Sequence, residues 1–185
     1  MRNKLFNLLI AALLIAFVVT AAFPMQAFAA TGGVTDANAL QELAKLRQAT
    51  VRYQDVNNAL ADGFVPVSEC VLNQDGTAGM GIHYANFDRL IDPSINAMEP
   101  ELLLYVPRAD GLKLVAVEYM FAIGPPDAPI PASPPAAPVL FGHSFDGPML
   151  GHGPGMPPHY DFHVWLWEAN PDGIFTDFNP NVKCP

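Results

Sequence analysis

Seven prolines fall within the 15 residues from Gly124 to Pro138. Because proline lacks a backbone N–H and fixes φ, neither a helix nor a central strand can run through such a segment. We expect an extended surface loop here. The glycines between residues 139 and 158 predict that the chain stays loop-like up to Pro158. A loop of this length inside one domain is often functional, and the regular elements must lie on either side of it.

Before the loop, apolar residues recur at spacings of three and four between residues 35 and 61, which predicts one long amphipathic helix. Thr35 or Asp36 can cap its first turn, and Gly63 stands where a left-handed residue would end it. The expected buried stripe comprises Leu40, Leu43, Leu46, Thr50, Tyr53, Val56 and Leu60.

Strand-like runs follow the helix. Residues 101 to 107 and 112 to 123 predict a β-hairpin that turns at residues 108 to 111, and residues 80 to 84 predict a short strand. After the loop, residues 160 to 167 are rich in aromatic and β-branched side chains and predict a central strand. We therefore expect an α+β domain in which the long N-terminal helix packs on an antiparallel sheet.

The first residues have the pattern of a cleavable signal peptide. Arg2 and Lys4 precede an uncharged apolar stretch from residue 5 to 22, and Ala27-Phe28-Ala29 suits signal peptidase. Residues 1 to 29 are thus predicted to be removed, which leaves residues 30 to 185 as a single secreted or periplasmic domain. An uncleaved membrane anchor is the alternative, because 18 apolar residues can just span a bilayer, but the small residues at the cleavage site favour removal.

The charge balance disfavours polyanionic partners. The chain carries 9 Lys and Arg against 18 Asp and Glu. Removal of Arg2 and Lys4 would take the net charge to about −11. We expect neither nucleic acid nor an anionic membrane to be a partner. The excess charge serves either solubility or the attraction of a cationic ligand.

Cys70 and Cys184 are the only cysteines. In an exported chain they have no other partner, so we expect one disulfide between them. The absence of a CxxC motif argues against thiol–disulfide exchange as a function.

Four of the five histidines lie between residues 143 and 163, and this clustering is the main functional signal. Strand alternation places His159, Asp161 and His163 on one face, offering two imidazoles with a carboxylate between them. They are either metal ligands or histidines that hydrogen-bond in an aromatic core. His143 and His152 lie in glycine-rich loops and are expected to be exposed.

Two further residues are candidate ligands. His83 follows Gly79 and Gly81, which allow another backbone or a ligand to approach closely. Glu118 shares a strand face with apolar residues, so it is either a second carboxylate in the same site or an ordinary edge charge. The predicted metal site thus contains His83, Glu118, Asp161, His159 and His163, with zinc or copper as the ion.

Other chemistries find little support. No serine lies in a Gly-x-Ser-x-Gly motif, and no phosphate-binding loop or dinucleotide fingerprint occurs. Trp165 and Trp167 either line a small-molecule or sugar site or belong to the core.

Several strings of residues together resemble a family of uncharacterised secreted bacterial proteins. They are Gly79-Met80-Gly81-Ile82-His83-Tyr84, Pro100-Glu101-Leu102-Leu103-Leu104-Tyr105, Val117-Glu118-Tyr119 and His159-Tyr160-Asp161-Phe162-His163-Val164-Trp165-Leu166-Trp167. The resemblance spans roughly residues 46 to 185 and implies no particular activity. The leading functional hypothesis is a secreted zinc- or copper-binding protein, with a metal-dependent reaction if a coordination position stays open. The alternative is a non-catalytic binding or cell-envelope protein that uses an aromatic face.

Overall fold

The computed structural model describes residues 36 to 185, which fold around one antiparallel sheet. Six of its strands lie in the order β1-β3-β4-β5-β9-β8, and the short β2 pairs with β3. The strands of this sheet are β1 (Phe64–Pro66), β2 (Val71–Leu72), β3 (Gly79–Asn86), β4 (Leu102–Arg108), β5 (Gly111–Ala122), β8 (Asp146–Met149) and β9 (His159–Val164). Together with the helices they confirm the predicted α+β class.

The β4–β5 hairpin forms where the sequence predicts it. Arg108 pairs with Gly111 across a two-residue turn, and Leu103 pairs with Val117 further along the ladder. The short strand predicted at residues 80 to 84 is the longer β3, which pairs with β4. Because β3 and β9 flank the hairpin on either side, β4 and β5 occupy the centre of the sheet.

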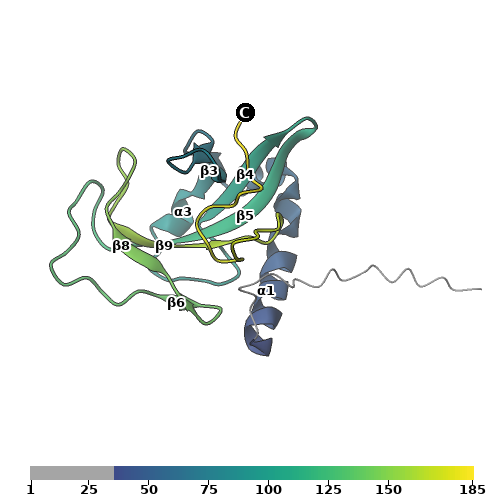
Figure 1. The fold of residues 1–185 in the computed structure, drawn as a ribbon. Coiled ribbons are helices and arrows are strands. Elements are labelled where there is room, and N and C mark those ends of the chain that lie inside the picture. The colour runs from purple at the N-terminus through teal and green to yellow at the C-terminus, as the bar shows by residue number, and fades with distance from the viewer. Residues whose placement is uncertain (1–35) are drawn as a thin grey trace, which may run out of the picture.

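The sheet buries both of its faces. One face packs against the helices in the larger apolar cluster, which includes Leu43, Leu46, Leu103, Tyr119 and Phe162. The other face carries a smaller apolar cluster, in which Val182 of the C-terminal segment packs with Leu104 and Trp165. In Figure 1 helix α1 and the yellow C-terminal segment accordingly flank the β4–β5 hairpin.

The prediction of one continuous helix over residues 35 to 61 is wrong. The structure has α1 (Ala37–Thr50), a 3₁₀ turn (Val51–Gln54) and α2 (Val56–Ala61) instead. Asp36 caps α1 by accepting from the N–H groups of Asn38 and Ala39, whereas Asp55 adopts an extended conformation and caps α2. Since an aspartate side chain competes for backbone N–H groups, Asp55 restarts the helix rather than continuing it.

The buried side chains differ from the expected stripe both in α1 and beyond the break, in α2. Leu43, Leu46 and Tyr53 are buried as expected, but Leu40 and Leu60 are 50% and 47% exposed. Ala39 and Ala59 are buried instead. A register extrapolated across Asp55 therefore does not hold, because α2 is a separate helix.

The C-terminal half differs from its prediction in two places. Strand β9 begins at His159 and ends at Val164, so the predicted strand over residues 160 to 167 begins one residue late and runs three residues past the true end. The stretch from 139 to 158 is not wholly irregular, because β8 pairs with β9 and two short strands, β6 (Val139–Leu140) and β7 (His143–Ser144), pair with each other. The proline-rich residues 124 to 138 form no helix or strand, as expected.

Cys70 and Cys184 form the predicted disulfide, with an S–S distance of 1.99 Å. It ties the C-terminal segment to β2, and the same segment bridges β3 through Gly79 and Asn179. Within residues 36 to 185 no helix is both long and apolar enough to cross a membrane. The predicted signal peptide, residues 1 to 29, lies outside the described residues.

Candidate metal-binding site

The face of the sheet that carries the smaller apolar cluster also carries a group of buried polar side chains. Directly paired residues of an antiparallel sheet share a face. Glu118 of β5 pairs with His163 of β9, and on the far side of β5 it pairs with Leu102. His83 of β3 pairs with Leu104, which lies two residues further along β4 on that same face. Three strands therefore contribute His83, Glu118 and His163 to one place.

These three side chains approach one another closely. The Oε2 atom of Glu118 lies 3.3 Å from Nε2 of His83 and 3.6 Å from Nε2 of His163. One donor atom from each residue lies within 4.8 Å of the others. Donor atoms around a tetrahedral zinc ion, each about 2.0 to 2.1 Å from it, are separated by about 3.3 to 3.4 Å. The spacing therefore matches that of metal ligands.

These residues and their neighbours on β9 are buried, yet several of their polar atoms have no hydrogen-bond partner. Of six buried side-chain atoms without a hydrogen-bond partner among the described residues, five belong here. They are Glu118 Oε2, His159 Nε2, Asp161 Oδ1, His163 Nδ1 and His163 Nε2. Each such atom costs about 1 to 3 kcal/mol unless a ligand, ion or water satisfies it. A cation at this place would satisfy several of these atoms at once.

Burial holds the histidines neutral. Removal from water lowers the pKa of His83 to about 4 and that of His163 to about 3, with smaller contributions from neighbouring histidines. Neutral imidazole is the form that binds transition metals. Both rings are therefore in their ligand form near neutral pH, without competition from a proton.

Burial has the opposite effect on the carboxyl groups. It raises the pKa of Glu118 well above its usual value, and the nearby Asp161 and Asp177 raise it further. Burial likewise raises the pKa of Asp161 to about 7, with Asp177 and Asp146 adding to the shift. A bound cation would reverse both shifts, because it stabilises the carboxylate form.

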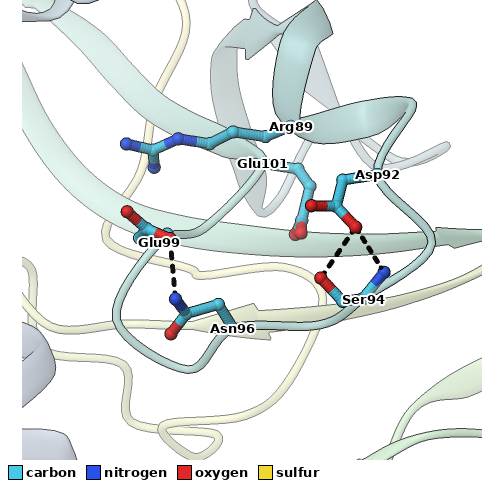
Figure 2. Close-up of a pocket in the computed structure, with 6 residues that line it drawn as sticks. All are labelled: Arg89, Asp92, Ser94, Asn96, Glu99 and Glu101. Atoms are coloured by element: carbon cyan, nitrogen blue, oxygen red, sulfur yellow. Dashed lines mark hydrogen bonds between the residues drawn. The ribbon is translucent and has the colours of Figure 1, made fainter.

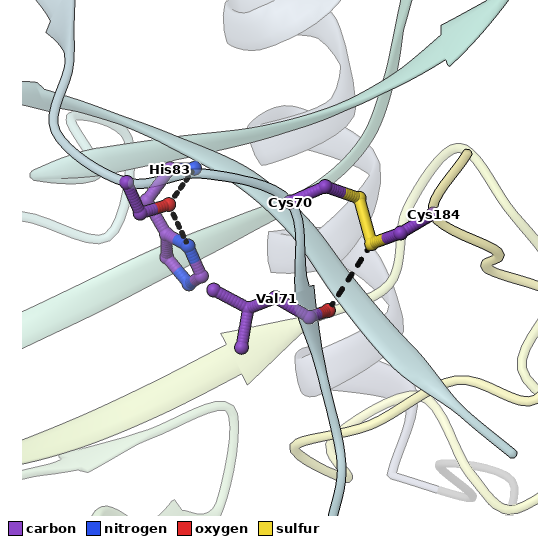
Figure 3. Close-up of a disulfide and its surroundings, with 5 residues drawn as sticks. Cys70, Val71, His83 and Cys184 are labelled. Atoms are coloured by element: carbon purple, nitrogen blue, oxygen red, sulfur yellow. Dashed lines mark hydrogen bonds between the residues drawn. A yellow bond between two sulfur atoms is a disulfide. The ribbon is translucent and has the colours of Figure 1, made fainter. Parts of the chain in front are cut away.

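Hydrogen bonds to Ser68 fix the position of His83. Ser68 Oγ accepts a hydrogen bond from the His83 backbone N–H at 2.9 Å and contacts Nδ1 of the ring at 3.0 Å. Figure 3 shows that ring beside Val71, next to the Cys70–Cys184 bond. A metal-binding histidine is usually oriented by a partner on its other ring nitrogen, and Ser68 occupies that place.

His159 and Asp161 lie next to this group on β9. Nδ1 of His159 lies 2.8 Å from the carbonyl oxygen of Pro157. A carbonyl can only accept, so Nδ1 carries the proton and Nε2 presents a lone pair. That Nε2 atom lies 3.9 Å from Oδ2 of Asp161, and the His159 side chain is fully buried.

Two residues of this site were not predicted as ligands. His152 is exposed on its loop, as expected, but its ring centroid lies 5.3 Å from that of His159. It forms a second group of possible ligands with His159 and Asp161. Asp177, in the C-terminal segment, forms a third group with Asp161 and His163. Neither could be found from periodicity, because both lie in irregular segments.

The structure also shows the positions of the other residues that the sequence singled out, Glu118, His143 and the two tryptophans. Glu118 is 3% exposed on a central strand, so it is not an edge charge. The His143 ring lies 4.3 Å from that of Phe175, tilted by 48°, and His143 belongs to none of the three groups. Trp165 is buried in the core, and Trp167 is partly buried beneath Arg47, which leaves no broad aromatic surface at these two residues.

A separate polar hollow of about 70 Å³ lies between α3 (Phe87–Leu90) and β4. Figure 2 shows the residues that line it, Arg89, Asp92, Ser94, Asn96, Glu99 and Glu101. Asp92 accepts hydrogen bonds from Ser94, and Asn96 donates to Glu99. No side-chain atom of these residues is among the described buried atoms without a hydrogen-bond partner, and the hollow shares no residue with the histidine cluster.

Comparison of the chain with protein-family models, with curated protein sequences and with solved structures found no match. The chemistry of the site therefore has to be argued from its own geometry. By that geometry it belongs to the class of mixed histidine and carboxylate sites that could hold a metal ion.

Proposed function

We propose that this protein binds a transition metal ion, zinc or copper, through Nε2 of His83, Nε2 of His163 and Oε2 of Glu118. The observation that carries the proposal is the set of two buried atoms without hydrogen-bond partners, Glu118 Oε2 and His163 Nε2, which lie 3.6 Å apart, with Oε2 also 3.3 Å from Nε2 of His83. A hydrogen-bonded histidine core, the other explanation of these residues, would leave no such set.

The ligand set favours these metals. Two imidazoles and one carboxylate form a known zinc site in which a fourth position is left for water or substrate. Copper(II) also accepts imidazole nitrogen and carboxylate oxygen, whereas magnesium and calcium prefer oxygen ligands alone. The open position would permit a metal-assisted reaction, but the proposed function is metal binding.

The proposal places the protein outside the cytoplasm. The leader-like residues 1 to 29 and the pairing of Cys70 with Cys184 support export, since disulfides persist in oxidising compartments. The resemblance to secreted bacterial proteins is consistent with that address. A metal ion, rather than nucleic acid or a membrane, is the proposed partner.

Calorimetric titration of metal-free, untagged protein with zinc and, separately, with copper tests the proposal. We expect wild type to bind at least one of the two ions and the His163→Ala variant to lose at least about 100-fold in affinity, because removal of even a supporting residue costs about 10- to 100-fold. His143→Ala is the matched control and should bind as wild type does.

Circular dichroism establishes that each variant is folded. A folded His163→Ala protein with wild-type affinity would contradict the proposed ligand set. Failure of wild type to bind either ion would contradict the function.

A further inference from the structure

We propose a second metal site beside the first, formed by Nε2 of His159, a carboxylate oxygen of Asp161 and a ring nitrogen of His152. The inference rests on the proposed metal-binding function but uses three different residues. The protein would then hold two adjacent ions, one buried between β3, β5 and β9 and one beneath the loop of residues 150 to 158.

His159 provides the firmest support for this second site. Its Nδ1–H donates to the Pro157 carbonyl, so Nε2 carries a lone pair. No hydrogen-bond donor reaches this lone pair. The side chain is fully buried, and Nε2 lies 3.9 Å from Oδ2 of Asp161, too far for a hydrogen bond. A ring in this orientation is already in the form that a metal ligand requires.

Asp161 and His152 complete the group. Donor atoms of His152, His159 and Asp161 lie within 4.8 Å of one another. The Oδ1 atom of Asp161 is a further buried atom without a partner. His152 is exposed, so this site opens towards solvent, whereas the first site is closed by residues that are each largely buried.

Charge also favours two ions over one. Four carboxyl groups gather here, because Asp146 pairs with Asp161 across β8 and β9, and Asp177 and Glu118 lie close to His163. Glu118 and Asp161 are buried, whereas Asp146 is exposed and the Asp177 side chain is 45% exposed, so each of the two sites has one buried carboxyl group whose charge a cation would compensate. Asp161, His163 and Asp177 form the group that links the two sites.

The test counts zinc ions. Untagged protein is dialysed to equilibrium against zinc and the bound ions are counted by native mass spectrometry, while diethylpyrocarbonate reports whether each exposed histidine is free to react. We expect two ions on wild type, with His152 protected and His143 reactive. His152→Ala and His159→Ala should each retain one ion, at the first site. His83→Ala should also retain one ion, but at the second site, so His152 should stay protected from the reagent.

His152 is exposed, so its replacement should not disturb folding. The His152→Ala variant therefore tests the second site even if His159→Ala fails to fold. Two ions on His152→Ala with unchanged affinity, or a single ion on wild type with His152 still reactive, would overturn the second site and leave the first intact. No ion on wild type would instead overturn the metal-binding function itself.

Discussion

Glu118 and His163 are direct partners across β5 and β9, and their Oε2 and Nε2 atoms lie 3.6 Å apart without forming a hydrogen bond. Both side chains are almost completely buried. Burial favours the protonated form of Glu118 and the neutral form of His163, so the pair carries little charge near neutral pH. A cation bound between them would favour the ionised form of Glu118.

Metal binding at the first site should release a proton from Glu118 wherever the metal-free carboxyl group is protonated. The pKa of Glu118 is raised in the metal-free protein, so its proton must leave when the carboxylate becomes a ligand, whereas His83 and His163 have none to lose. Affinity should fall as the pH is lowered. Calorimetry in buffers of different ionisation enthalpy measures the number of protons released. An observed heat that does not depend on the buffer would contradict this prediction.

Glu101→Gln should stabilise the protein at high pH and change little at low pH. Burial raises the pKa of Glu101 to about 7 in the folded state, above its usual 4.5. Between these values the folded chain retains a proton that the unfolded chain has released, so the free energy of unfolding falls as the pH rises. The variant has no carboxyl group that ionises here, so it should be about 3 kcal/mol more stable than wild type above pH 7. Urea denaturation of both proteins at pH 4 and pH 8 measures the difference, and an equal effect at the two values would contradict the explanation.

Gly81→Ala should destabilise the protein by at least about 2 kcal/mol. Gly81 has a φ of +99°, and an added Cβ would lie 2.5 Å from the carbonyl oxygen of Tyr105 on the neighbouring strand. Gly76 is the matched control, since it also has a positive φ but nothing within 4 Å of an added Cβ. Gly76→Ala should cost about 1 kcal/mol. Chemical denaturation compares the two variants, and equal losses would show that the close approach of β4 does not matter.

Replacing Cys70 and Cys184 with serine should lower the free energy of unfolding by about 4 to 5 kcal/mol, because the bond closes a loop with a sequence separation of 114. Denaturation of oxidised wild type and of the double variant measures the loss. Reduced wild type serves as the control and should match the variant. If reduction leaves the unfolding transition unchanged, the bond contributes nothing to stability.

Much of the site follows from strand periodicity. Alternation alone places His159, Asp161 and His163 on one face, and the hairpin pattern puts Glu118 on a strand with apolar neighbours. The sequence does not reveal that β5 and β9 pair directly, since long-range strand pairing depends on packing between distant segments. It is this pairing that brings Glu118 to His163.

Other features lie beyond local patterns. His152 and Asp177 reach the site from irregular segments, where no period predicts the direction of a side chain. The helix break at Asp55 arises from competition between capping and continuation, which an apolar stripe does not reveal. The disulfide could be predicted because only two cysteines are present.

Anomalous diffraction from zinc- and copper-soaked crystals tests the central claim most directly, because it locates the ion. The account predicts a peak about 2.0 to 2.2 Å from Nε2 of His83, Nε2 of His163 and Oε2 of Glu118. Crystals that show no peak between these three atoms with either metal would contradict it.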